Sequence, residues 1–296
     1  LETGATDAAV DYTSGSGNDT LVFNYTVASG NVSDDLDYKG TTSLAVGTSI
    51  LDLAGNGLVT TLATPGATNS ISVNKAIIID GAVPTIDSVS TTTADGYYKE
   101  GDSLDIVLFV SEELAVTGTP RITLETGEAD ASVTFTSNAD SQQLLFRYTI
   151  AAGHNSSDLD YTDTTSVALD GGTILDLAGN PLPLTLAVPG QAGSISPTNA
   201  LVVDTQAPAC SLAYFNFTQP LLSNLGKGED RLDIKAMFNE KIKSSPTLSV
   251  FWPVATDSTH VDKGFTGSED DDSTWTYTIT ALPELTTYTG NITVRL

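Results

Sequence analysis

A six-residue motif, LDLAGN, occurs twice in the chain, 124 residues apart, and contains its clearest candidate metal ligands. Each copy places an aspartate and an asparagine four positions apart, Asp52 with Asn56 and Asp176 with Asn180, around an Ala-Gly pair. A tight turn at this pair can direct both side-chain oxygens to one hard cation such as Ca²⁺. The same spacing suits a turn stabilised by the aspartate side chain, with glycine at positive φ, and for the motif alone this interpretation is favoured.

Other acidic residues stand where predicted strands begin or end, and Asp80 and Asp204 stand at the ends of two repeats. If these groups gather at one end of a domain, their charges repel one another unless a cation neutralises them. We therefore predict calcium at the domain junctions, bound with the weak affinity of extracellular modules, about 10⁻⁴ to 10⁻³ M. The predicted metal ligands are Asp52, Asn56, Asp80, Asp102, Glu112, Asp176, Asn180, Asp204, Asp230 and Glu240.

A second acidic pattern, DLDY, places two aspartates on one face of an extended segment: Asp35 with Asp37, and Asp158 with Asp160. Leucine and tyrosine alternate with these acids, as in the edge strand of a sheet. We interpret the pattern as a solvated edge strand in preference to a metal site.

An internal repeat contains both copies of these two motifs. The sequence LETG at residues 1–4 recurs at residues 124–127, and the two copies stay in register, at an offset of 123 and then 124 residues, up to Pro84 and Pro208. A period of this size is that of one small domain. Nothing in the first copy corresponds to residues 97–123, so we expect it to lack its N-terminal strands, and the chain to be a segment of something longer.

The repeats are predicted to consist of β-strands. Leu104, Ile106, Leu108 and Val110 alternate with other residues, which is the period of a strand that is at least half buried. Turns rich in Gly, Asn, Asp and Ser recur about every ten residues, which favours a β-sandwich. We predict an all-β chain of tandem immunoglobulin-like antiparallel β-sandwiches: a first repeat at residues 1–82, a complete second repeat at 83–204 and a divergent domain at 205–296.

Composition excludes several functions. A net charge of −25 and a pI near 4.1 leave no basic surface for nucleic acid or for anionic lipid headgroups. No apolar run of 18 residues is present, so we expect no membrane insertion in this segment. The single cysteine, Cys210, excludes a disulfide framework and is expected to be a small buried residue.

Catalysis is not expected. The only histidines, His154 and His260, lie in polar stretches, and Asn31 takes the place of His154 in the first repeat, which a required base would not tolerate. No nucleophile motif or phosphate-binding loop appears. We predict a non-enzymatic protein.

Six asparagines precede x-Ser or x-Thr and are acceptor sequences for N-glycosylation. Serine and threonine are frequent enough to generate several such sequences by chance, so occupancy stays open. The predicted acceptors are Asn18, Asn24, Asn31, Asn155, Asn216 and Asn291.

As a set, the repeated motifs LETG, DLDY and LDLAGN, with a closing Val-Asp-x-x-x-Pro in the second copy, resemble the bacterial immunoglobulin-like repeats of very large surface proteins and adhesins. The resemblance is close up to about residue 208 and loose after it. It implies an extracellular stalk of tandem β-sandwiches, often with calcium at the domain junctions.

We therefore expect an extracellular stalk or adhesin segment at the cell surface, with neighbouring repeats of a longer chain, surface glycans or other surface proteins as partners. The alternative is a self-assembling subunit of a surface layer, filament or appendage. A third option, a carbohydrate-binding module, requires an exposed aromatic platform at Phe251, Trp252 and Trp275, whereas burial of both tryptophans is favoured.

Overall fold

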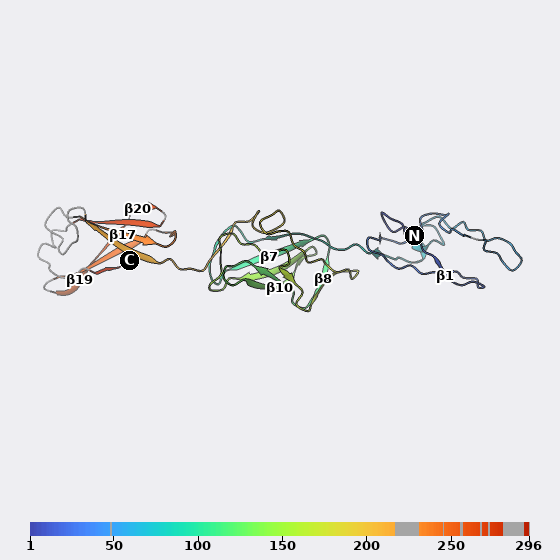
Figure 1. Ribbon diagram of the computed structural model, residues 1–296, viewed down its shortest axis with the longest axis horizontal. Coiled ribbons are helices and arrows are strands. Elements are labelled where there is room, and N and C mark those ends of the chain that lie inside the picture. The colour runs from blue at the N-terminus through green and yellow to red at the C-terminus, as the bar shows by residue number, and fades with distance from the viewer. Residues whose placement is uncertain are drawn as a thin grey trace. The chain divides into compact units, whose positions relative to one another are not determined.

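A computed structural model describes residues 1–47, 49–216, 231–244, 246–254, 257–266, 268–271, 273–280 and 293–295 (Figure 1). The structure is nearly all-β, with 35% of residues in strands and 2% in helices, and its sheets are antiparallel apart from one parallel pair. The all-β prediction is therefore confirmed. The chain divides into two compact units, Leu1–Thr205 and Gln206–Leu296, and the second is called the C-terminal unit below.

The second repeat contains a six-stranded sheet, a three-stranded sheet and a strand pair (β7, β8 and β10 in Figure 1). The six strands follow the order β13-β9-β10-β11-β7-β5, which are Val167–Ala168, Arg121–Leu124, Ala131–Asp140, Gln143–Thr149, Ser103–Val110 and Ile86–Thr91. The other strands are β12 (Asn155–Ser156), β15 (Leu201–Asp204) and β6 (Gly96–Tyr98) in one sheet, and β14 (Thr173–Asp176) with β8 (Leu114–Thr117) in the pair.

The period-two pattern of β7 places its apolar side chains in the core. Leu104, Ile106 and Leu108 are fully buried, and each lies opposite an equally buried residue of β11. The same apolar cluster includes Ile174 of β14 and Leu201 of β15, so the three sheets share one core. Burial of each such side chain contributes about 1.5–3 kcal/mol to the free energy of folding.

The first repeat contains shorter strands. β1 (Tyr12–Ser14) pairs with β2 (Val22–Phe23), and β3 (Val32–Ser33) pairs with β4 (Ile79–Asp80). The one helix of the described residues, α1, is a single turn at Ile71–Asn74. Phe23, Val27 and Leu58 of this repeat are exposed, although their counterparts in the second repeat, Phe146, Ile150 and Leu182, are buried.

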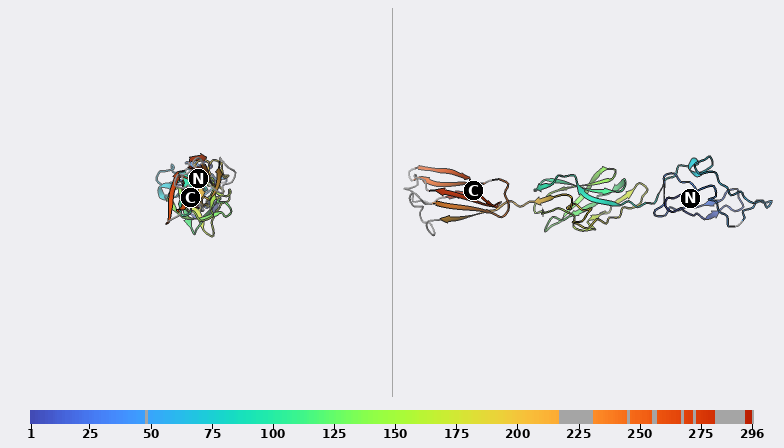
Figure 2. Two further views of the ribbon diagram at one scale, coloured as in Figure 1. Left: turned by 90° about the vertical axis from the view of Figure 1, so that its left-hand side faces the viewer. Right: turned by 90° about the horizontal axis from the view of Figure 1, so that it is seen from above.

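The C-terminal unit contains two sheets, seen side-on in the right-hand view of Figure 2. Its buried cluster includes Ile234, Leu248, Trp275 and Tyr277, so the expected burial is confirmed for Trp275, while the side chain of Trp252 lies outside the described residues. The strands are β16 (Cys210–Asn216), β17 (Arg231–Phe238), β21 (Thr274–Thr280) and β20 (Ser268–Asp271) in one sheet, and β19 (Asp257–Thr266), β18 (Thr247–Val254) and β22 (Thr293–Arg295) in the other.

The predicted burial of Cys210 is wrong, because its side chain is exposed. Cys210 is the first residue of β16, which lies at the edge of its sheet. Two residues further on, Leu212 packs against the core. The thiol therefore shares the strand face of Leu212, and its position at the start of an edge strand leaves it exposed.

Candidate functional site

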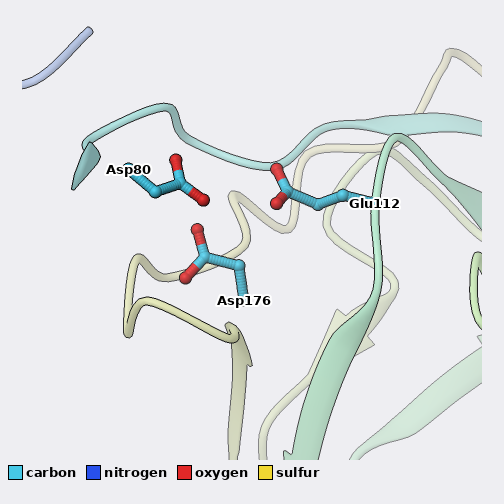
Figure 3. Close-up of side chains that lie close together, drawn as sticks. All are labelled: Asp80, Glu112 and Asp176. Atoms are coloured by element: carbon cyan, nitrogen blue, oxygen red, sulfur yellow. The ribbon is translucent and has the colours of Figure 1, made fainter. Parts of the chain in front are cut away.

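Three carboxylates converge where the first repeat meets the second (Figure 3). Asp80, Glu112 and Asp176 each offer one oxygen, and these oxygens all lie within 4.8 Å of one another. Asp176 is buried, and the other two are half-buried. Among the described residues this is the one cluster of three or more acidic, histidine or cysteine side chains with such spacing.

Strand pairing brings the three residues together. Asp176 ends β14 and lies opposite Leu114 of β8, and Glu112 precedes Leu114 by two residues. Asp80 ends β4 and belongs to the first repeat. Two carboxylates from one repeat therefore meet a third from the repeat before it.

The LDLAGN turn forms in both repeats as the favoured interpretation predicts. Asp176 Oδ1 accepts hydrogen bonds from the backbone N–H groups of Gly179 at 2.7 Å and Asn180 at 2.8 Å, and Asp176 Oδ2 accepts one from Asn180 Nδ2 at 2.7 Å. Gly179 has a φ of +99°, which L side chains adopt with strain. Asp52 makes the same contacts to Asn56 in an exposed turn of the first repeat.

The turn of the second repeat has a further partner. Asn180 Nδ2 also donates to the backbone carbonyl of Asp80, at 3.1 Å. One side-chain amide therefore joins the turn to the last strand of the first repeat, beside the three carboxylates.

The surroundings shift the pKa values of Glu112 and Asp176 in opposite directions. Burial raises the pKa of Glu112, and the negative charges of Asp80 and Asp176 raise it further. For Asp176, burial opposes ionisation, but hydrogen bonds from Asn180 and Gly179 outweigh it and lower the pKa. The ion pairs of Lys39, Lys99, Arg121 and Arg147 involve other carboxylates. A donor set made only of oxygen suits a hard divalent cation such as Ca²⁺.

Other predicted ligands lie elsewhere. Asp102 precedes β7 and Glu112 follows it, so a strand of eight residues separates them, and the expectation that both gather at one end is wrong. Instead, Asp102 Oδ2 accepts a hydrogen bond from the backbone N–H of Lys99 at 3.0 Å. Asp204 ends β15, Glu240 follows β17, and Asp230 lies outside the described residues.

The interpretation of DLDY as a solvated edge strand is wrong for Asp37 and Asp160, which are both buried. Asp160 accepts hydrogen bonds from the backbone N–H groups of Tyr161, Gly190, Ile195 and Ser196 and from Ser196 Oγ, at 2.9–3.3 Å.

Asp37 repeats this arrangement with Tyr38, Gly66, Ile71 and Ser72. Burial opposes ionisation of both aspartates, but these hydrogen bonds outweigh it and lower each pKa. Protein donors thus occupy the oxygens, and each carboxylate anchors a distant loop. The repeated pattern Gly-x-x-x-Ser-Ile-Ser at residues 66–72 and 190–196 was the available signal.

His154 has a structural partner. Its Nδ1 lies 2.8 Å from the hydroxyl of Tyr148, whose pKa burial raises to about 12. In the first repeat, Tyr25 donates to Asn31 Oδ1 at 2.9 Å. The exchange of histidine for asparagine therefore preserves a hydrogen bond to a tyrosine.

The predicted glycosylation sites differ in exposure. Asn18 and Asn24 are exposed. Asn31 and Asn155 are half-buried, and Asn155 Nδ2 donates to the carbonyl of Gly153 at 3.2 Å. The side chain of Asn216 and all of Asn291 lie outside the described residues.

Neither the protein-family models nor the curated proteins compared with this chain match it. Over the described residues, the structure contains no helix of the length and apolarity needed to span a membrane.

Proposed function

We propose that the chain is a non-catalytic stalk segment of an extracellular cell-surface protein, built from tandem immunoglobulin-like β-sandwiches and stiffened by calcium at the junction of its first two repeats. The meeting of Asp80 with Glu112 and Asp176 is the observation that supports this proposal most. Calcium bound there would connect carboxylates of successive repeats and remove their mutual repulsion. The shared core of the second repeat and the internal repetition support a series of similar domains.

Each residue has a defined part in such a site. Asp80, Glu112 and Asp176 would supply the carboxylate oxygens, and the charge of the ion would balance theirs. Asn180 positions two of the ligand groups, because its amide contacts both Asp176 and the backbone of Asp80. The remaining ligands of a six- to eight-coordinate ion would be water.

Thermal unfolding tests the proposal. With a Kd of about 10⁻⁴ to 10⁻³ M, about 10 mM calcium stabilises the folded chain by about 1.4–2.7 kcal/mol relative to chelator. Calorimetry of the wild type with calcium and with chelator should show this shift. Glu112→Gln should reduce it strongly, whereas Glu113→Gln, at the adjacent exposed glutamate, should retain it.

Two results would count against the proposal. If the wild type unfolds at the same temperature with calcium and with chelator, the junction binds no calcium in this range. If Glu112→Gln and Glu113→Gln respond equally, calcium binds elsewhere. Sedimentation with calcium tests the stalk itself, because a stalk segment remains monomeric at high concentration and a lattice subunit forms arrays.

A further inference from the structure

The LDLAGN turns of the two repeats differ in the residue that follows their asparagine. Asn56 is followed by Gly57, the single Asn-Gly pair of the chain, whereas Asn180 is followed by Pro181. In an Asn-Gly pair the backbone nitrogen can closely approach the side-chain carbonyl carbon of the asparagine, because glycine has no Cβ to obstruct it. Proline has no backbone N–H and cannot react in this way. The two turns therefore differ in the chemical stability of their asparagine.

The backbone N–H of Gly57 is available for such a reaction. Gly57 forms an antiparallel bridge with Leu51, and the hydrogen bonds of this bridge, at 2.8 and 3.0 Å, are made by the residues on either side of the pair. No residue that the structure describes accepts a hydrogen bond from the N–H of Gly57. The second repeat shows that the position requires no N–H, because Pro181 forms the same bridge with Leu175.

The turn around Asn56 is also open to water. Residues 51–57 are all exposed, and a Cβ added to Gly57 would meet no atom within 4 Å. The amide of Asn56 donates to Asp52 Oδ2 at 2.9 Å, within the same exposed turn. By contrast, Asn180 is half-buried and its amide donates to two acceptors. Sequence and exposure thus both distinguish the turn of the first repeat.

We propose that Asn56 is a site of spontaneous deamidation, a reaction to which asparagine owes part of its thermal lability. The backbone nitrogen of Gly57 loses its proton to hydroxide or buffer and attacks the side-chain carbonyl carbon of Asn56. A new C–N bond closes a five-membered succinimide, and the side-chain nitrogen leaves as ammonia. Water then adds to one of the two ring carbonyls and opens the ring, which yields aspartate or isoaspartate at position 56. Water is the one co-reactant consumed, and nothing is oxidised or reduced.

The product would weaken the turn. The pKa of Asp52 is lowered mainly because its carboxylate accepts the hydrogen bond from the Asn56 side chain. A carboxylate at position 56 cannot donate this bond, and its negative charge would repel that of Asp52. Isoaspartate also adds a carbon to the backbone, which would displace Gly57 from its bridge with Leu51. This inference concerns covalent chemistry of the first repeat and depends neither on the stalk nor on calcium.

Ageing of the full chain tests the proposal. The protein is produced in bacteria, so that its asparagines carry no glycan, and is kept for days in mildly alkaline buffer before peptide mass spectrometry. We expect the peptide containing Asn56 to deamidate at least tenfold faster than those containing the exposed Asn18 and Asn24, with isoaspartate among the products. The matched variant is Gly57→Pro, which gives the first turn the Asn-Pro sequence of the second and should suppress the reaction at Asn56 at least tenfold.

Three results would overturn the proposal. One is deamidation of Asn56 that is no faster than that of Asn18 and Asn24 in the wild type. Another is an equal rate in the wild type and in Gly57→Pro, because the reaction would then not use the nitrogen of Gly57. The third is conversion to aspartate alone, since direct hydrolysis of the amide forms no succinimide and therefore no isoaspartate.

Discussion

Replacement of Asp160 by asparagine should destabilise the second repeat strongly, even though Asp160→Asn changes the size of the side chain very little. The carboxylate accepts five hydrogen bonds, four of them from the distant residues Gly190, Ile195 and Ser196. An amide retains one accepting oxygen and turns an NH₂ group toward backbone N–H donors.

The loss follows from these contacts. If the amide nitrogen replaces Oδ2, the N–H groups of Gly190 and Ser196 lose their charged acceptor, although Gly190 retains a hydrogen bond to Ser194 Oγ at 2.9 Å. Hydrogen bonds to charged groups contribute about 1.5–3 kcal/mol each, and buried unpaired donors cost similar amounts. We expect a loss of about 2–4 kcal/mol, which lowers the melting temperature of a domain of this size by about 10 °C.

The chain contains its own control for this measurement. Both tryptophans, Trp252 and Trp275, lie in the C-terminal unit, so tryptophan fluorescence reports unfolding of that unit and should not change. Calorimetry reports the second repeat as well and should show the shift. Asp158→Asn alters an exposed aspartate two residues away and should change stability by less than about 0.5 kcal/mol.

Lowering the pH should weaken the same hydrogen bonds to Asp160. Folding lowers the pKa of Asp160 below its unfolded value of about 3.9, so the unfolded chain binds more protons in acid. The stabilisation is therefore present above about pH 4 and is lost as the pH falls through the lower, folded pKa. Asp160→Asn should be less sensitive to acid in this range. A change of stability below 0.5 kcal/mol on substitution, with unaltered acid sensitivity, would refute our account of this anchor.

Three further predictions concern the junction and the turns. Without calcium, Glu112→Gln should raise the melting temperature at pH 7. The pKa of Glu112 is raised in the folded chain, so its negative charge opposes folding at this pH. A melting temperature in calorimetry no higher than that of Glu113→Gln would contradict this. Gly179→Ala should lower stability by about 1–2 kcal/mol because alanine is strained at a φ of +99°, and an unchanged urea midpoint would be inconsistent with the turn described. His154→Ala removes the hydrogen-bond acceptor of Tyr148 and should lower the free energy of unfolding by about 1 kcal/mol. His154→Asn should lower it by less. Equal losses in urea unfolding would show that this hydrogen bond does not stabilise the fold.

The sequence predicts those features that depend on neighbouring residues. The alternation from Leu104 to Val110 predicts a buried strand because burial in a strand has a period of two residues. The LDLAGN turns follow from the side chain of an aspartate and the φ of a glycine three residues later. The division of the chain at residues 82 and 204 into three domains stays a prediction.

Features that depend on distant residues were predicted less well. The burial of Asp160 does not follow from DLDY, which by itself resembles an exposed edge, because all partners of Asp160 except Tyr161 lie 30 or more residues further along the chain. The separation of Asp102 from Glu112 by a strand of eight residues is readable from the alternation of residues 104–110, and it argues against a shared site for these two carboxylates. The cluster of Asp80, Glu112 and Asp176 needed both the strand pairing of β14 with β8 and the contact between repeats.

The shared amide of Asn180 has a mechanical consequence. The backbone carbonyl of Asp80 is linked to the LDLAGN turn through this one hydrogen bond of 3.1 Å, whereas β7 is held along its whole length by β11. Tension on the chain at Asp80 would therefore break the amide contact at a lower force than the β7–β11 ladder. The hydrogen bond between Asn180 and Asp80 would break first and would re-form once the tension is released, while the core of the second repeat remains folded.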